Sequence, residues 1–207
     1  MKGTKDKIRE TALHLFNEQG LSETALRDIA SSLQISPGNL TYHYRHKEDL
    51  IEALYFELVE KLDVQLRMNA NAEDMLEWVI RVNAHFMRLL YAYRFFLRDL
   101  YLIMGAYGSI RTHYQELQQR RTREFLQIFD LLIEQGLMRP PEFEQEYERL
   151  YERMNILGDN WINAMKLLNS RLDNPVVYYS GLLLESLYPY LTKTGKTRLL
   201  ESQDRLL

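Results

Sequence analysis

Apolar residues recur at steps of three and four along almost the whole chain, and no stretch alternates apolar and polar positions as a strand would. Such steps place the apolar side chains on one face of an α-helix. The pattern therefore predicts an all-α fold. The helices that we expect cover residues 5–19, 25–33, 37–44, 47–62, 75–93, 109–135, 141–169 and 175–191, followed by a short tail over 192–207.

Glycine and proline mark several of the expected helix limits. Ser36 followed by Pro37 is a helix-start signal, because the serine oxygen can accept an N–H that lacks a partner, and proline loses no hydrogen bond at the first helical position. Residues 158–160, Gly-Asp-Asn, can kink or break the helix that contains them. Similar signals predict a helix end at Gly136, further starts at Pro140-Pro141 and Asn174-Pro175, and an end at Pro189.

The composition is ordinary for a globular protein. The chain has 207 residues, of which 46% are hydrophobic and 27% charged, which argues against disorder. The formal net charge is -3, so any basic patch must be local. Cysteine is absent, which excludes disulfides, cysteine-based zinc sites and cysteine nucleophiles.

Two features bear on location. The first ten residues, MKGTKDKIRE, lack the apolar core of a signal peptide. The richest apolar stretch, residues 89–108, is interrupted by Arg94, Arg98 and Asp99, so it does not read as a membrane span. We therefore expect a cytoplasmic protein without a membrane partner.

The short helix expected over residues 37–44 is polar on its outward side. Its outward residues and those that follow it are hydrogen-bonding or basic and include no carboxylate: Asn39, Thr41, Tyr42, His43, Arg45, His46 and Lys47. A protruding helix of this kind suits a nucleic-acid groove. We place a three-helix DNA-binding domain at residues 1–46 and a helical domain at 47–207, with the helix from Lys47 connecting the two.

The N-terminal segment, from about residue 5 to 54, resembles the DNA-binding domain of the TetR family of transcriptional regulators. The resemblance covers about a quarter of the chain. The residues that carry it are Ile8, Ala12, Phe16, Gly20, Thr24, Ile29-Ala30, Ile35-Ser36, Gly38-Asn39-Leu40, Tyr42-His43-Tyr44, Lys47-Glu48 and Leu50.

The resemblance implies a C-terminal domain that binds a small molecule and forms a homodimer, usually of a repressor. Two positions depart from the family pattern. Gln34 stands where the family usually has glycine, so a longer residue must take the turn conformation that glycine takes at little cost. Thr41 stands where the family often has a phosphate-contacting tyrosine, and its reach is shorter.

The resemblance and the chemistry agree on the expected DNA contacts. Thr24 would cap the second helix and present its hydroxyl or its N–H near a phosphate, with Arg27 as a second phosphate contact. Asn39 is the expected reader of a base edge, and Thr41 meets either a phosphate or a thymine methyl. The other expected contacts are Ser36, Pro37 and Gly38 at the start of the recognition helix, Tyr42 and His43 at phosphates, and Lys47 at a phosphate.

Simpler interpretations of the aromatic and histidine residues stand beside this one. Tyr42 could be a core aromatic and His43 an ordinary surface residue, although the acid-free surroundings favour DNA contact for both. Tyr44 matches a buried aromatic of the family, and we expect it in the core. His43 and His46 are three residues apart, but no third ligand lies nearby, so we expect no metal and no cofactor.

The pocket residues of the C-terminal domain are predicted from large side chains beside chain breaks or polar neighbours. They are Phe96, Tyr101, Trp161 and Asn160, although aromatics at helical spacing are more often core. Arg121 interrupts an apolar stripe. A buried guanidinium would need a carboxylate such as Asp99 or an anionic ligand. The stripe could instead drift so that Arg121 points to solvent, which is the interpretation that we favour.

Helices 141–169 and 175–191 are the expected dimer interface. Ser180 and Gly181 are small enough to allow close helix approach. A symmetric homodimer would present two recognition helices to half-sites of a palindromic double-stranded DNA operator, roughly 34 Å apart. We expect an unknown small molecule to tilt the helix from Lys47 and so change this separation.

Two other function classes remain. An enzyme is disfavoured, because the five histidines are scattered and no phosphate loop or nucleophile motif is present. A helical interaction protein that kept the fold but binds a protein partner stays open, because Gln34 and Thr41 depart from the family pattern.

Overall fold

The computed structural model describes residues 3–67, 74–169 and 171–203. Within these ranges the regular structure is helical apart from an isolated bridge between Met138 and Leu191, so the all-α prediction is confirmed. The helices are α1 (Thr4–Glu18), α2 (Leu26–Ser32), α3 (Pro37–His43), α4 (Lys47–Arg67), α5 (Met75–Ala92), α6 (Arg94–Arg98), α7 (Leu100–Ala106), α8 (Gly108–Glu134), α9 (Glu146–Leu168), α10 (Pro175–Glu185), the 3-10 helix η1 (Tyr188–Tyr190) and α11 (Lys193–Gln203).

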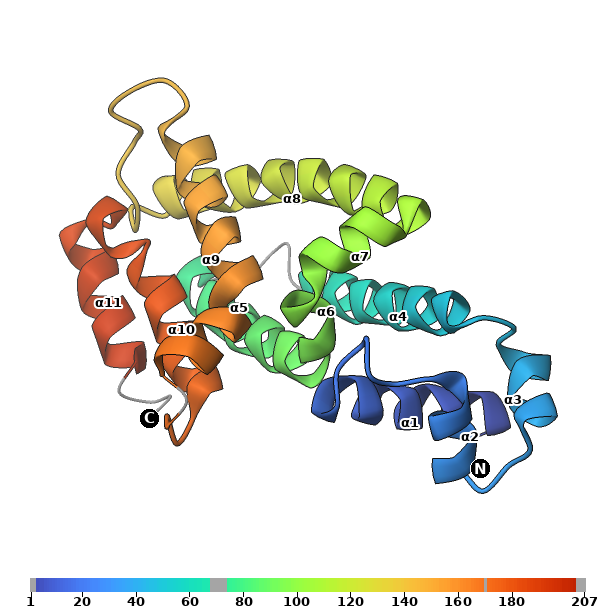
Figure 1. Cartoon of the computed structure of the whole chain (residues 1–207). Helices are drawn as coiled ribbons and strands as arrows, with labels where there is room; N and C mark the ends of the chain where they lie inside the picture. The colour runs from blue at the N-terminus through green and yellow to red at the C-terminus, as the bar shows by residue number, and fades with distance from the viewer. Residues whose placement is uncertain (1–2, 68–73, 170, 204–207) are drawn as a thin grey trace.

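Helices α1, α2 and α3 form a unit at one end of the molecule, and α4 leads away from it (Figure 1). The apolar stripes of these helices meet in one core, in which Ile8, Phe16, Ile29 and Leu40 are fully buried. Leu50, near the start of α4, belongs to the same core. Burial of these stripes is what stabilises helices as short as α2 and α3, which would not persist alone.

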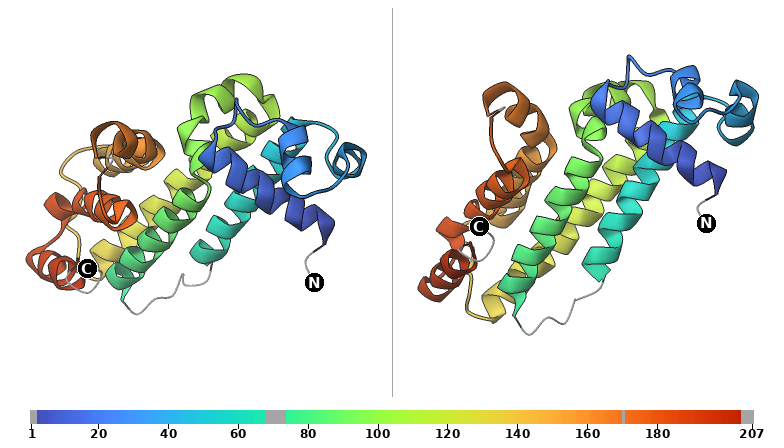
Figure 2. Two further views of the ribbon diagram at one scale, coloured as in Figure 1. Left: turned by 60° about the horizontal axis from the view of Figure 1, so that its bottom comes forward. Right: turned by 90° about the horizontal axis from the view of Figure 1, so that it is seen from below.

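Five of the remaining helices form two layers. Figure 2 shows α4, α5 and α8 side by side, and α5 contacts both α4 and α8. Helices α9 and α10 cover this layer, since α9 packs on α8 and α10 on α5. The short helix α6 contacts α1 on one side and α9 on the other, so it joins the N-terminal unit to the second layer.

The expected helix over residues 141–169 begins later than predicted. Pro140 and Pro141 lie in a loop, and α9 starts at Glu146. A residue before proline is disfavoured in the α conformation, which applies to Pro140. The preceding backbone is also held by long-range hydrogen bonds, including Arg139 N to Tyr190 O at 2.9 Å. Once started, α9 runs through residues 158–160 without the predicted break, because one glycine costs a packed helix only about 1 kcal/mol.

The C-terminal end also differs from the prediction. Helix α10 ends at Glu185, and Pro189 lies in the 3-10 helix that follows. The expected tail instead contains α11, which buries Leu199 completely. Gly195 of α11 lies so close to the Leu137 carbonyl that any side chain would collide with it. This helix was missed because its pattern shows few apolar residues and its docking depends on a glycine contact with a distant segment.

Candidate DNA-binding surface and ligand cavity

The turn between α2 and α3 adopts the conformation that the sequence requires. Gln34 has a φ of 55°, in the left-handed region that glycine takes at least cost. Ser36 is the N-cap of α3, and its Oγ accepts the Asn39 N–H at 3.2 Å. Pro37 occupies the first turn. The predicted start of α3 and the strained turn at Gln34 are therefore both confirmed.

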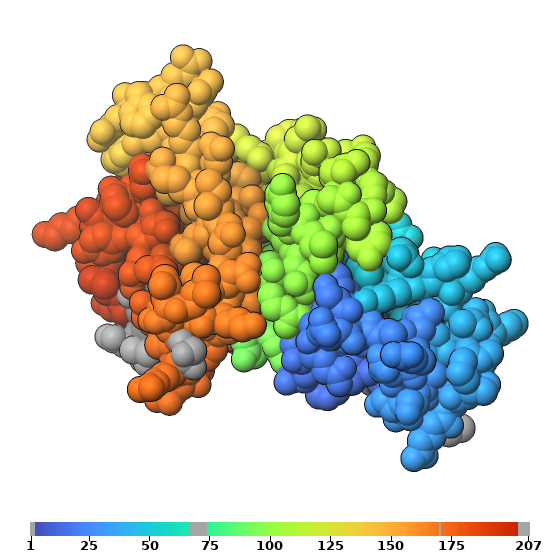
Figure 3. All heavy atoms as spheres, in the orientation of Figure 1, coloured from blue at the N-terminus to red at the C-terminus, as the bar shows by residue number. Residues whose placement is uncertain are grey.

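Helix α3 is attached to the N-terminal unit by few side chains and presents the rest to solvent. Leu40 is fully buried and Tyr44, just after the helix, is 4% exposed, as expected for a core aromatic. Asn39 is exposed, and Tyr42 is 85% exposed, with its ring edge-on to His43 at 5.2 Å between centroids. Figure 3 shows the N-terminal unit as a separate lobe at one end of the molecule.

Thr41 is exposed, but its hydroxyl is already engaged. It donates to the Pro37 carbonyl at 3.0 Å, with the Gly38 carbonyl at 3.2 Å as a second acceptor. Back-bonding of this kind is common for threonine inside helices. It leaves the methyl group, rather than the hydroxyl hydrogen, for contact with a ligand.

The predicted capping role of Thr24 is wrong, and its predicted phosphate contact stays a prediction for its backbone N–H alone. Thr24 is 1% exposed, and its hydroxyl donates to the Gly20 carbonyl at 2.9 Å, so it cannot present this group to a phosphate. Helix α2 starts later, with Ala25 as N-cap, and Asp28 accepts the Ala25 N–H at 2.7 Å. A carboxylate from the first turn thus takes the capping role. The Arg27 side chain is 85% exposed and extends into solvent.

Lys47 is partly buried in this structure. Its ammonium group donates to the Leu21 carbonyl and lies 5.8 Å from the centre of the Phe16 ring. Burial lowers the pKa of Lys47 from its ordinary value, although nearby carboxylates, Glu48 first among them, act in the opposite direction. The lysine therefore ties the start of α4 to the end of the α1 segment, and its predicted phosphate contact stays a prediction.

A polar anchor joins the end of α1 to α6. The Asn17 amide donates to the Ala92 carbonyl at 2.8 Å and accepts the Phe95 N–H at 3.0 Å. Arg98 donates to the carbonyls of Phe16 and Asn17, at 2.7 and 3.1 Å. Sequence reasoning missed this anchor, because asparagine in an amphipathic helix gives no sign that its partners lie 75 or more residues away.

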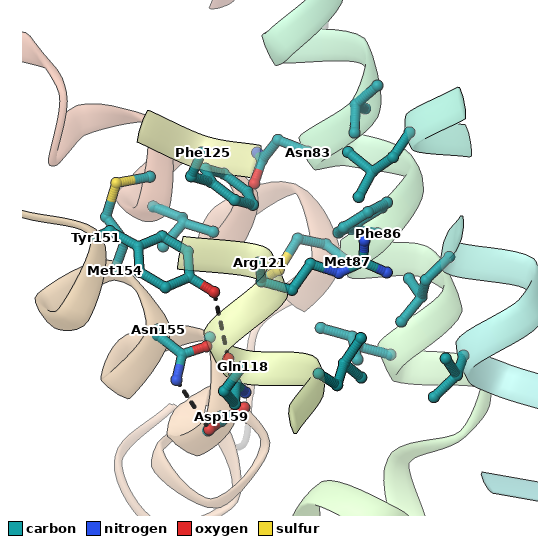
Figure 4. Close-up of a pocket in the computed structure, with 18 of the residues that line it drawn as sticks. Asn83, Phe86, Met87, Gln118, Arg121, Phe125, Tyr151, Met154, Asn155 and Asp159 are labelled. Carbon is teal, nitrogen blue, oxygen red and sulfur yellow. Dashed lines mark hydrogen bonds between the residues drawn. The ribbon is translucent and has the colours of Figure 1, made fainter. Parts of the chain in front are cut away.

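A cavity of about 180 Å³ lies between α4, α5, α8, α9 and α10 (Figure 4). Most of its lining is apolar, as is usual for small-molecule sites. Helix α4 contributes five of the lining side chains: Tyr55, Leu58, Val59, Leu62 and Leu66. The lining also includes the polar residues Asn83, Tyr114, Gln118, Arg121, Tyr151, Asn155 and Asp159.

Asp159 is the centre of the polar end of the cavity. Its Oδ2 accepts the Tyr114 hydroxyl and, at 3.4 Å, the Asn155 amide. Nearby, the Tyr151 hydroxyl donates to Gln118 Oε1 at 3.2 Å. Burial raises the pKa of the Asp159 carboxyl above its ordinary value, although the Tyr114 hydrogen bond acts in the opposite direction. Burial likewise raises the pKa of Tyr114 and of Tyr151.

Arg121 is buried, contrary to the interpretation that it points to solvent. Only 9% of its side chain is exposed, and its guanidinium group pairs with Asp63 of α4 and, at 2.6 Å, with Glu124. The predicted partner Asp99 pairs with Arg98 instead, at 3.2 Å. The Asp63 pair links α8 directly to the C-terminal half of α4.

Of the other predicted pocket residues, only Phe96 lines the cavity. Tyr101 is 94% exposed on α7, and Asn160 is exposed, with its amide donating to the Ile156 carbonyl at 2.8 Å. Trp161 is fully buried but packs elsewhere, against Tyr91 and Tyr179. None of these three residues lines this cavity, because a polar neighbour in sequence does not indicate which side of a helix faces a cavity.

The expected dimer helices expose apolar side chains. They are Ile156, Leu167 and Leu168 of α9 and Tyr178 and Leu182 of α10, between 36% and 81% exposed. Ser180 is not part of this surface. It is buried, and both its hydroxyl and its carbonyl accept the Asn83 amide of α5. This small residue therefore allows α10 to approach α5 within the chain.

Neither a metal-binding cluster nor a membrane-spanning helix is present in the described residues. No group of three or more histidine, aspartate or glutamate side chains there is placed to hold a metal ion. None of the helices in those ranges combines the length and the apolar character of a membrane span.

The structure combines an exposed helix after a tight turn with a long helix, α4, that leads to a domain with an apolar cavity. This combination defines a helix-turn-helix transcriptional regulator. Two family models match: "Bacterial regulatory proteins, tetR family" over residues 8–54, and "Bacterial transcriptional repressor" of the TetR type over 57–199. The chain belongs to the TetR family of transcriptional regulators.

Individual relatives agree with this assignment. The chain is 28% identical over 182 residues to the probable HTH-type transcriptional regulator YttP of Bacillus subtilis, covering 84% of this chain and 82% of that protein. It is 27% identical over 135 residues to IcaR of Staphylococcus aureus, a negative regulator of the biofilm operon icaADBC, covering 61% and 69%. A TetR-family regulator from Marinobacter aquaeolei VT8 superposes with a TM-score of 0.88 at 27% identity, over 99% of each chain. The interpretation as a protein-binding module that lost DNA binding is not favoured.

Proposed function

We propose that this regulator is a repressor that binds a palindromic operator as a homodimer and releases it when a small molecule fills the cavity. The observation that carries the proposal is the exposed face of α3, where Asn39, Tyr42 and the partly exposed His43 extend from a helix whose buried side chain is Leu40. No carboxylate lies between Ser36 and Lys47 to repel phosphates. We place the boundary of the DNA-binding domain after residue 46, and no catalytic role is proposed.

The role that we assign to each side chain follows from its exposure. Asn39, in the first turn of α3, reads a base edge, and the Thr41 methyl group meets a thymine methyl or a sugar. Arg27, Tyr42 and His43 contact phosphates, since all three extend from the same lobe. Around the start of α3, Ser36, Pro37 and Gly38 allow close approach of the backbone to DNA.

The exposed apolar surface of α9 and α10 is the proposed dimer interface. A monomer rarely leaves side chains as apolar as Leu167 and Leu168 about four-fifths exposed on adjacent positions. Pairing α9 and α10 with the same helices of a second copy would cover them. The resulting two-fold symmetry would set the two recognition helices at half-sites roughly 34 Å apart.

Helix α4 is the proposed transmission element. It begins at the DNA-binding unit, contributes five side chains to the cavity lining, and pairs through Asp63 with Arg121 on the cavity wall. A ligand that binds more tightly when α4 is in one orientation than in another shifts the protein toward that orientation. The separation of the two recognition helices changes with it.

The experiment measures binding of the purified protein to DNA from its own upstream region, by fluorescence anisotropy at several salt concentrations. Asn39→Ala should change which sequence is preferred. Arg27→Ala should weaken binding to all sequences and reduce the log-log salt slope by about one unit. Arg123→Ala, an exposed residue on α8, is the matched control and should change neither. Equal effects of the Asn39 and Arg27 substitutions would refute the assigned roles.

A further inference from the structure

The cavity contains a carboxylate whose hydrogen-bonding capacity is only half used. Both printed donors to Asp159, the Tyr114 hydroxyl and the Asn155 amide, reach the same oxygen, Oδ2. No hydrogen bond to its Oδ1 and no ion pair to Asp159 is found among the described residues. Figure 4 shows the Asp159 carboxylate beside Asn155 and Gln118 at the edge of the cavity. Asp159 is partly buried, and withdrawing a carboxylate from water without a counter-ion is costly unless something else supplies the positive charge.

Arg121 is the one cationic residue among the described residues that line the cavity, and it does not supply this charge. Arg121 is held by Asp63 and by Glu124, and Asp63 also pairs with Arg120 at 3.0 Å. Two carboxylates and two guanidinium groups thus neutralise one another on the side of the cavity formed by α4 and α8. Among the described lining residues, Asp159 is the charged group that has no cationic partner.

Aromatic rings stand around the same carboxylate. Tyr114 and Tyr151 line the cavity next to Asp159, and Phe125 packs on Tyr151 with 4.9 Å between ring centroids. The faces of aromatic rings carry negative electrostatic potential and attract organic cations. Beyond them the lining is apolar, through residues such as Leu62 and Phe86. The cavity therefore combines one negative charge, aromatic rings and an apolar interior.

We propose that the effector is an amphipathic organic cation, an amine or a quaternary ammonium compound, whose charged group lies against Asp159, Tyr114 and Tyr151 and whose apolar part fills the rest of the cavity. This inference rests on the proposed function of the cavity as the effector site. An anionic effector fits less well, because it would have to displace Asp63 or Glu124 from Arg121 and would add a second negative charge near Asp159.

The test compares two probes of the same shape. Benzyltrimethylammonium carries the charge, and neopentylbenzene replaces its nitrogen by carbon and is neutral. Calorimetric titration of the full chain, without DNA, gives the affinity for each probe, and 3-phenylpropionate serves as the anionic probe. The variants are Asp159→Asn, which keeps the side-chain shape, and Asp130→Asn, an exposed carboxylate on α8, as the matched control. Melting curves without a probe establish that both variants are folded.

We expect the ammonium compound to bind at least about tenfold more tightly than its neutral isostere. Asp159→Asn should remove this preference while leaving the affinity for neopentylbenzene unchanged, and Asp130→Asn should retain it. Equal affinity for the two probes, an undiminished preference in Asp159→Asn, or tighter binding of 3-phenylpropionate would each overturn the proposal. Because DNA is absent from the titration, failure to bind an operator would refute the regulator model separately and leave the cation result standing.

Discussion

Replacing Arg121 by methionine should destabilise the protein, because it removes the charge that neutralises a buried carboxylate. The Asp63 side chain is 13% exposed and pairs with both Arg121 and Arg120. Breaking a buried pair by removing one partner costs about 3–5 kcal/mol. Here Arg120 stays with Asp63, and the other partner, Glu124, is 35% exposed and can turn to water. We therefore expect a loss of about 2–3 kcal/mol in the free energy of unfolding.

The double variant Asp63→Leu with Arg121→Met separates the pair from its individual charges. Each single variant leaves one charge of the pair without its partner, whereas the double variant removes both charges. The double variant should therefore lose less stability than the sum of the losses in Asp63→Leu and Arg121→Met, by about 1–2 kcal/mol. Urea unfolding followed by circular dichroism, at one fixed protein concentration, gives the free energies of unfolding of the parent, the two single variants and the double variant. Arg123→Met, exposed on the same helix, is the control and should stay within about 0.5 kcal/mol of the parent.

Additive effects of the two single substitutions would refute this reasoning. They would mean that Asp63 and Arg121 contribute independently, so that the contact is not a link between α4 and α8. A change below about 0.5 kcal/mol for Arg121→Met would have the same consequence, since no buried charge would have lost its partner.

Three further predictions concern other parts of the chain. Gln34→Gly should raise the free energy of unfolding by up to about 1 kcal/mol, because glycine takes a φ of 55° without strain, whereas Gln34→Val should lower it; urea unfolding of both variants tests this. Asn17→Ala should cost about 2–4 kcal/mol in the same assay, because it leaves the Phe95 N–H and the Ala92 carbonyl without their partner. The hydrogen bond from Arg139 holds the pKa of Glu146 at about 2, against an ordinary value of 4.5. The ionised carboxylate therefore stabilises the fold fully above about pH 4.5, and this contribution is lost as the pH falls toward 2. The difference in melting temperature between the parent and Glu146→Gln should shrink over that pH range, and a constant difference would contradict the prediction.

Helix limits could be predicted where a local signal decides them. Ser36 with Pro37 and Asn174 with Pro175 cap their helices in the structure, each with a side-chain oxygen that accepts an N–H of the first turn. The start of α9 could not be predicted in this way. It depends on hydrogen bonds between residues 137–139 and 190–192, which form only when the chain has folded. Local capping energies of about 1 kcal/mol do not outweigh such tertiary contacts.

The exposed side of α3 could be predicted, because a helix of seven residues buries one apolar side chain, Leu40, and leaves its polar side chains in solvent. The cavity could not, because it depends on how α9 is rotated about its own axis. Asp159 faces the cavity, and Trp161, two residues later, faces Tyr91 and Tyr179. Two residues along an α-helix correspond to a rotation of about 200°, so the two side chains point to nearly opposite sides. Without the packing of α8 on α9, the sequence offers no way to choose between them.

The burial of Arg121 could have been predicted from the sequence. The geometry of an α-helix contradicts the interpretation that its apolar stripe turns far enough to expose this residue. The stripe of α8 runs through Ile110, Arg121 and Leu132 at steps of three and four, and a helix advances about 100° per residue. Over the whole stripe the accumulated drift is only about 40°, too little to turn its middle residue to solvent. An arginine in such a stripe must therefore be buried and paired. Its partner, Asp63, lies on another helix 58 residues away, and only the packing of α4 against α8 identifies it. That pairing is also what makes the arginine informative about function, because it joins the cavity wall to the helix that carries the DNA-binding unit.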